Sequence, residues 1–180
     1  MTLRRFLVLA SMLLLGVGSL YAQAGFGITV TVRFISVELQ DIHNAPHPGW
    51  NLGVVDTHTL YTMVDSQGVY VRNQSNVPLD VAMNVADLGP DSIWPSYTNW
   101  VPEDSLINPL GFRLEMIWAT GDTSPADWSA AHGLIDTIRT VATGLPPGWS
   151  PWAFLRFRSP AYATDTYIHR FQVTWIFTEH

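Results

Sequence analysis

Cysteine and lysine are both absent from this 180-residue chain. Without cysteine the protein has no disulfide, no thiol nucleophile, no iron–sulfur cluster and no haem attached through cysteine. The fold must therefore be held together by side-chain packing and backbone pairing alone. The sequence indicates no cofactor.

Charged residues are scarce as well, at 13% of the chain, and all nine basic residues are arginine. From residue 25 onward, seven arginines stand against fifteen Asp and Glu, which gives a net charge of −8 (7 − 15). An acidic surface argues against nucleic acid and anionic membranes as partners. Apolar residues make up 47% of the chain, a balance typical of a folded protein rather than a disordered one.

The first 24 residues have the pattern of a secretory signal peptide. The basic pair Arg4-Arg5 precedes an apolar run over residues 6–17, and Ala22-Gln23-Ala24 has the small-x-small pattern of a cleavage site. The apolar run is shorter than the ~20 residues that a membrane-spanning helix needs. We therefore expect cleavage after Ala24, no remaining transmembrane anchor, and a single domain of residues 25–180 that is secreted, either extracellular or at the cell surface.

Apolar and polar residues alternate along much of the remaining chain, which predicts half-buried antiparallel strands. Every second residue is apolar in Leu79–Val85, in Phe112–Trp118 and in Phe171–Phe177. Shorter patterns of the same kind lie at residues 69–72 and 153–157. A further strand is expected within residues 134–143. Turn-rich stretches with Pro and Gly separate these segments.

One segment, residues 124–133, predicts a short helix instead. Ser124 is a candidate N-cap, Pro125 suits the first helical position, and Gly133 would end the helix. Seven or more strands with this one helix favour an all-β fold, an antiparallel β-sandwich of immunoglobulin-like or jelly-roll type. A closed barrel is the lesser alternative.

Three stretches together resemble a known class of exported proteins. They are "VRNQSNVPLDVAMNVAD", "GLPPGWSPWAFLRFRSP" and the closing "FQVTWIFTEH", and Asn73, Asn76 and Pro78 carry the first of them. These turn and strand patterns are similar to those of the TasA/camelysin-like class of bacterial β-sandwich proteins, which build extracellular fibres. The resemblance implies a structural role and transfers no catalytic residue. The chain has no HExxH motif that would support a metallopeptidase.

The stretch "GITVTVRFISVELQD" changes the parity of its apolar residues halfway. Ile28, Val30, Val32 and Phe34 alternate first, and the pattern then moves to Ile35, Val37 and Leu39. A strand cannot change its buried face without a bulge, a bend or a move to another sheet. In one interpretation, a first strand crosses between the two sheets of its own sandwich. In the other, residues 28–34 form a donor strand that adds to a neighbouring subunit.

His43 and His47, with Asp56 and His58 nearby, have the side chains of a zinc or copper site. The first two lie in a proline-rich loop rather than four residues apart on a helix, so solvated loop histidines are the simpler interpretation. These three histidines remain the candidates for a metal-dependent hydrolase, the least favoured function.

Trp94, Tyr97 and Trp100 lie in a long loop with four carboxylates, Asp87, Asp91, Glu103 and Asp104. Aromatic faces beside carboxylates are typical of sugar sites, where rings stack and carboxylates bond hydroxyl groups. An acidic loop held down by packed aromatic residues is the simpler interpretation. A secreted carbohydrate-binding module is therefore the alternative function.

The chain contains no GxSxG elbow, P-loop or Ser-His-Asp order, so we do not expect an enzyme. The expected function is a secreted structural subunit of an extracellular filament or surface layer. Its expected partner is itself, through β-strand addition that uses Ile28, Val30, Val32 and Phe34.

Overall fold

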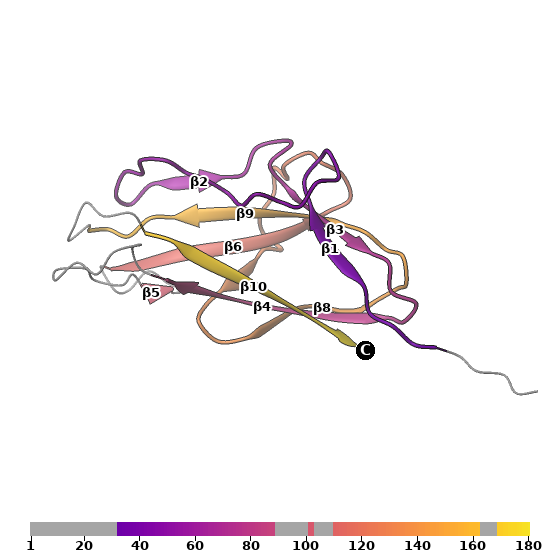
Figure 1. Ribbon diagram of the computed structural model, residues 1–180. Coiled ribbons are helices and arrows are strands. Elements are labelled where there is room, and N and C mark those ends of the chain that lie inside the picture. Colours follow the sequence, from indigo (N-terminus) through magenta and orange to yellow (C-terminus); the bar gives the residue numbers. More distant parts are fainter. Residues whose placement is uncertain (1–31, 89–100, 103–109, 163–168) are drawn as a thin grey trace, which may run out of the picture. The chain divides into compact units, whose positions relative to one another are not determined.

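The computed structural model describes residues 32–88, 101–102, 110–162 and 169–180 (Figure 1). By the contacts within the chain, the protein divides into two units, Met1–Val32 and Arg33–His180. The ten strands described all lie in the second unit. The described residues contain no helix that is long and apolar enough to cross a membrane. The unit Arg33–His180 therefore holds all the described strands and the core that they enclose.

The larger sheet, sheet A, follows one main path of five strands. Their order is β1 (Val37–Gln40), β3 (Val69–Asn73), β9 (Trp152–Arg158), β6 (Gly111–Ala119) and β5 (Val101–Pro102). Off this path, β2 (Leu60–Thr62) also pairs with β9, and β7 (His132–Leu134) also pairs with β6. All these pairs are antiparallel except the two-residue pairing of β5 with β6.

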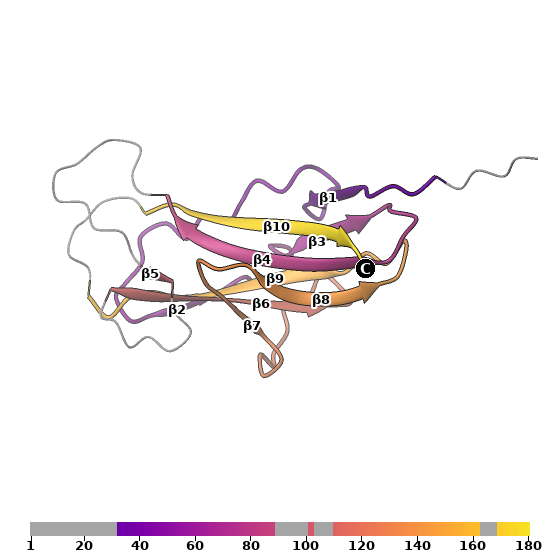
Figure 2. The same cartoon turned by 90° about the horizontal axis from the view of Figure 1, so that it is seen from below.

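The smaller sheet, sheet B, has three antiparallel strands in the order β10 (Phe171–Glu179), β4 (Leu79–Asp87) and β8 (Arg139–Leu145). Figure 2 shows the two sheets as layers. Aromatic rings of the two sheets meet between them. The ring centroids of Phe112 and Phe171 are 4.5 Å apart, and those of Trp118 and Trp175 are 5.9 Å apart. These contacts confirm the predicted all-β sandwich of two antiparallel sheets.

The predicted alternation is confirmed most clearly in β4. Leu79, Val81, Met83 and Val85 are at most 1% exposed, whereas the residues between them are partly exposed. Burial of an apolar side chain of this size contributes about 1.5–3 kcal/mol. The inward residues Leu114, Met116 and Phe157 are also buried. Period-2 patterning thus fixes the face of β4, β6 and β9 that lines the core.

The outer face of sheet A is buried too, which the sequence pattern does not predict. Phe154 is 0% exposed on this face, beside Gly68, and Glu115 is 5% exposed. Arg113 and Arg156 both form ion pairs with the Glu115 carboxylate, and the Trp128 ring lies 4.7 Å from the Arg156 guanidinium. Glu115, which the alternation places on the solvent face, is therefore buried and paired with two arginines that balance its charge.

The helix predicted over residues 124–133 is wrong. Asp127 instead accepts bonds from the backbone and hydroxyl of Ser129 at 2.8 and 2.9 Å, and the Trp128 indole donates to the Pro125 carbonyl. Asp and Ser side chains compete in this way for the backbone groups that a helix would use. Ser124 also bonds residues of a distant loop instead of capping a helix. Residues 124–131 form an irregular connection with a turn at residues 128–131.

The strand expected within residues 134–143 is two strands. β7 pairs with β6 in sheet A, and β8 pairs with β4 in sheet B. The chain turns at residues 136–137 between them, and the backbone N–H of Val85 bonds the Ile135 carbonyl on the way. A continuous apolar pattern cannot show that its two halves pair with different sheets.

Gly68 provides a test of the packing on the outer face. A Cβ at this position would lie 2.7 Å from Cζ of Phe154, a ring that has no exposed surface into which it could move. We expect Gly68→Ala to destabilise the fold by about 1–3 kcal/mol through overpacking. Urea unfolding measures the loss. Gly121→Ala is the control, because its Cβ would meet no atom within 4 Å, and an equal loss in both variants would contradict this packing.

Candidate functional site

The three candidate metal ligands are separate in the loop between β1 and β2. His43 and His58 are exposed. Both ring nitrogens of His47 lie within hydrogen-bond distance of backbone groups. Nε2 of His47 lies 3.3 Å from the Gln67 carbonyl, and Nδ1 accepts a bond from Gly49 N. Within the described ranges, no three His, Cys, Asp or Glu side chains form a group that could hold a metal ion.

Most of the acidic aromatic loop lies outside the described residues, namely Trp94, Tyr97, Trp100, Asp91, Glu103 and Asp104. Asp87 is described, and its side chain is only 2% exposed at the end of β4. Its Oδ2 lies 3.1 Å from Nδ1 of His169, just before β10. Asp87 therefore joins β4 to the start of β10 rather than offering a carboxylate to solvent.

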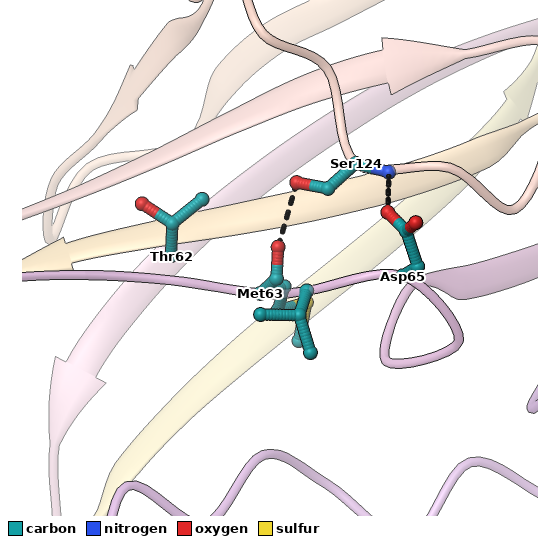
Figure 3. A pocket seen from close by; sticks show the side chains of 5 residues that line it. Thr62, Met63, Asp65 and Ser124 are labelled. Atoms are coloured by element: carbon teal, nitrogen blue, oxygen red, sulfur yellow. Dashed lines mark hydrogen bonds between the residues drawn. The ribbon is translucent and has the colours of Figure 1, made fainter.

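A shallow pocket lies where the loop after β2 meets the loop after β6 (Figure 3). The Ser124 hydroxyl donates to the Met63 carbonyl at 2.7 Å, and Ser124 N donates to the Asp65 carboxylate at the same distance. Thr62 and Val64 complete the lining. The Ser124 hydroxyl bonds a carbonyl and not a general base, so it is not activated as a nucleophile. Its two bonds instead hold the two loops together.

The candidate donor segment is described only at its end. Ile28 and Val30 lie outside the described residues, whereas Val32 is 67% and Phe34 48% exposed. The backbone of Phe34 is held by its own sandwich, because Phe34 N donates to the Asn76 side chain and Asn76 N to the Phe34 carbonyl. A segment able to leave the sandwich would therefore comprise residues before Phe34.

Residues 34–36 extend the pairing of β1 with β3 without forming a regular strand. Ser36 N bonds the Ser75 hydroxyl, and Gln74 N bonds the Ser36 carbonyl, each at 2.9 Å. Asn73, buried below this turn, accepts a bond from Ser75 N. The Asn73–Asn76 stretch, which the sequence singled out as a turn, thus anchors the chain as it enters β1.

The change of parity in the opening stretch coincides with a contact to the second sheet. Val37 and Leu39 pack against the core from sheet A. One residue before Phe34, the Arg33 guanidinium forms an exposed ion pair with Glu179 at the end of β10 in sheet B. The chain therefore enters the sandwich beside the end of β10.

Sheet B is narrower than sheet A in the part of the chain that the structure describes. The inward side chains of β10 are only partly buried, although they lie opposite residues of β4 that are 0% exposed. The opposed pairs are Val173 with Val85, Trp175 with Met83, and Phe177 with Val81. The apolar core is therefore incompletely covered along β10.

The end of β10 also contains a titrating contact. The pKa of the Asp80 carboxyl is lowered, mainly because it accepts a bond from Gly144 N at 2.9 Å. Burial partly opposes this shift, and His180 Nδ1, 2.7 Å away, adds to it. A lowered pKa contributes stability above the unfolded-state value of about 3.9 and loses it as pH falls through the folded-state value.

We expect Asp80→Asn to lower the melting temperature at neutral pH, because the amide loses the charge that these partners favour. The difference from wild type should shrink as pH falls below the unfolded-state value of about 3.9 and disappear only below the lowered folded-state value, where the carboxyl is protonated in both states. Thermal melts from pH 2 to pH 7 measure it. Asp136→Asn is the control, since Asp136 is exposed, and a difference that stays constant down to pH 2 would contradict the assignment.

Comparison with known proteins does not place the chain in a family. No family model matches it, and no curated protein matches it either.

Proposed function

We propose that this protein is a secreted structural subunit of an extracellular filament or surface layer. After removal of residues 1–24, residues 25–32 of one subunit would add as a β-strand to the sandwich of the next. Backbone hydrogen bonds supply the affinity of strand addition, and alternate side chains supply its specificity. Ile28, Val30 and Val32 are the alternate apolar side chains of this segment.

The incomplete cover of the core along sheet B carries the proposal. Val173, Trp175 and Phe177 are partly exposed beside fully buried neighbours, so one further strand would complete their burial. The chain itself has an alternating apolar segment of matching type just before Arg33. An open sheet edge and an alternating apolar segment in the same chain are what the two halves of such a joint require.

Such a joint produces a chain of subunits and not a closed pair. The donor and the acceptor are different parts of the surface, so each contact is head to tail and leaves a free donor and a free acceptor. Contacts of this kind propagate into filaments unless the rotation between subunits closes a ring. The resemblance to the TasA/camelysin-like fibre proteins supports the same function.

Sedimentation velocity of residues 25–180 over a wide concentration range tests the proposal. We expect monomer at the lowest concentrations and a broadening distribution of larger species as concentration rises, because each joint obeys mass action. A single monomer boundary at every concentration would show that the protein does not polymerise.

A further inference from the structure

Sheets present unpaired backbone groups at their edges, and soluble proteins protect them with short strands, bulges, proline, lysine or covering loops. Six of the described strands pair with a single neighbour, and five of them have such protection. β2 and β7 have only three residues each. β1 has only four residues, and the loop after it bonds back through His47 N to the Leu39 carbonyl and through a bridge between Gln40 and Pro46. β5 has two residues, one of them Pro102.

The edge formed by β8 is irregular. Its register with β4 shifts twice, between Leu79 and Val81 and between Val81 and Ala82. On β8 itself, Gly144 has a left-handed φ of 63°, and the Val141 carbonyl accepts a bond from the Trp118 indole. A bulged strand with one carbonyl already bonded is a poor template for another strand.

β10 has none of these protections among the described residues. It runs for nine residues in unbroken register with β4 and contains no proline, lysine or glycine. In Figure 2, β10 is the outermost strand of its layer, and β1 of the other sheet lies beyond it. No described strand pairs with the outer side of β10.

The register identifies which amides of β10 point outward. Leu88 N bonds the Arg170 carbonyl at one end, and His180 N bonds the Pro78 carbonyl at the other. Because bonded and non-bonded pairs alternate in an antiparallel ladder, even-numbered residues of β10 bond β4. The N–H and C=O groups of Val173, Trp175 and Phe177 therefore point away from β4, along the open edge.

We infer that this edge of β10 is the acceptor, and that its occupant is the segment of residues 25–32 of a second copy. The inference rests on the proposed function and names the surface at which it operates. The outward backbone groups and the partly exposed side chains belong to the same three residues, Val173, Trp175 and Phe177. A strand beside β10 would form hydrogen bonds with these backbone groups and cover these side chains.

The proposed occupant matches β10 in length and charge. Eight residues span about 27 Å at about 3.4 Å each, close to the length of the nine-residue β10. The segment Gly25–Val32 has no charged side chain, so the only charge near the apolar edge would be the α-amino group that cleavage leaves at the end of the segment.

A second copy is favoured over the same chain by the way the chain enters the sandwich. Arg33 lies beside Glu179, at the end of β10, and the chain then runs into β1 away from that end (Figure 1). To lie along its own β10, the segment would need a reversal of direction between Val32 and Val37. That stretch contains no Gly, Pro, Asn or Asp, and its one residue common in turns, Ser36, is already bonded to residues 74 and 75.

Amide hydrogen exchange, followed residue by residue by NMR, tests the acceptor directly. The sample is residues 33–180, which contain all the described strands, with and without a synthetic peptide of residues 25–32. Without peptide, the amides of Gln172, Thr174 and Ile176 should exchange slowly and those of Val173, Trp175 and Phe177 rapidly. With peptide, the latter three should slow by at least about tenfold, because they gain hydrogen bonds.

The other outcomes overturn the inference in distinguishable ways. If residues 25–180 polymerise but the peptide protects another edge, β10 is not the acceptor and the proposed function stands. If the peptide protects nothing and residues 25–180 stay monomeric with an exposed β10 edge, both fail. If monomeric 25–180 already protects these three amides, the segment pairs with its own β10 and the second copy is the wrong occupant.

A pair of variants at one position gives an independent test. Val173→Pro removes an outward N–H that β4 does not use, and proline is tolerated on edge strands where the N–H faces solvent. Val173→Ala keeps the N–H and removes two methyl groups, so it controls for any effect of losing the valine packing. We expect polymer to be lost in the proline variant only, with similar melting temperatures for both; equal assembly by both would overturn the inference.

Discussion

Deletion of residues 25–32 should abolish polymers and leave a folded, exportable monomer. The described strands and buried core residues all lie after Arg33, so the sandwich loses no strand when the segment is removed. What is lost is the donor half of every joint, which strand addition requires. Size-exclusion chromatography and circular dichroism of residues 33–180 measure the two parts of this result. Polymers that form as before would reject the mechanism.

Mixing makes this experiment sharper, because the deleted protein would still present an acceptor. Added at a few per cent to residues 25–180, it should stop growth at one end and shorten the polymers.

Two point variants separate the faces of the segment. Val30→Lys places a charge on the apolar side and should block assembly, whereas Thr31→Lys, on the opposite side, should permit it. Equal effects of the two lysines would contradict a strand-like donor.

The largest loss of stability should follow Phe157→Ala. Phe157 is 2% exposed, and its ring centroid lies 5.7 Å from that of Phe112 and 5.4 Å from that of Phe171. These rings come from β9, β6 and β10, so they join the two sheets. Removing the ring loses its burial and leaves a cavity, which costs about 3–5 kcal/mol. Urea unfolding of residues 33–180 measures this loss separately from assembly.

Val54→Ala is the control for this loss, because Val54 is 96% exposed and should contribute little. Similar midpoints for the two variants would show that the three rings do not form the centre of the core. The chain has no cysteine, so no disulfide compensates for lost packing, and a change in the core should appear in full in the unfolding curve.

The sequence predicts the strands whose two faces differ. β4 has strict alternation, and its apolar residues are all buried, because one face meets the core. The same rule does not anticipate that Phe154 and Glu115 are buried on the outer face of sheet A. That face is covered by irregular segments, and only the folded chain brings Gly68 and Trp128 over it. Local periodicity does not report such long-range cover.

The candidate site shows a similar division. The alternating segment before Arg33 is visible in the sequence, and so is the change of parity at Phe34–Ile35. The anchoring of Phe34 by Asn76 is not, since it joins residues 42 positions apart. Nor does the pattern of Phe171–Phe177 distinguish an edge strand from a central one. That distinction depends on which strands are neighbours, a property of topology rather than of sequence pattern.

Negative-stain electron microscopy of residues 25–180 over a range of concentrations tests the central claim most directly. Subunits that join head to tail through an added strand should form filaments that lengthen as concentration rises. Isolated particles at every concentration would contradict the account.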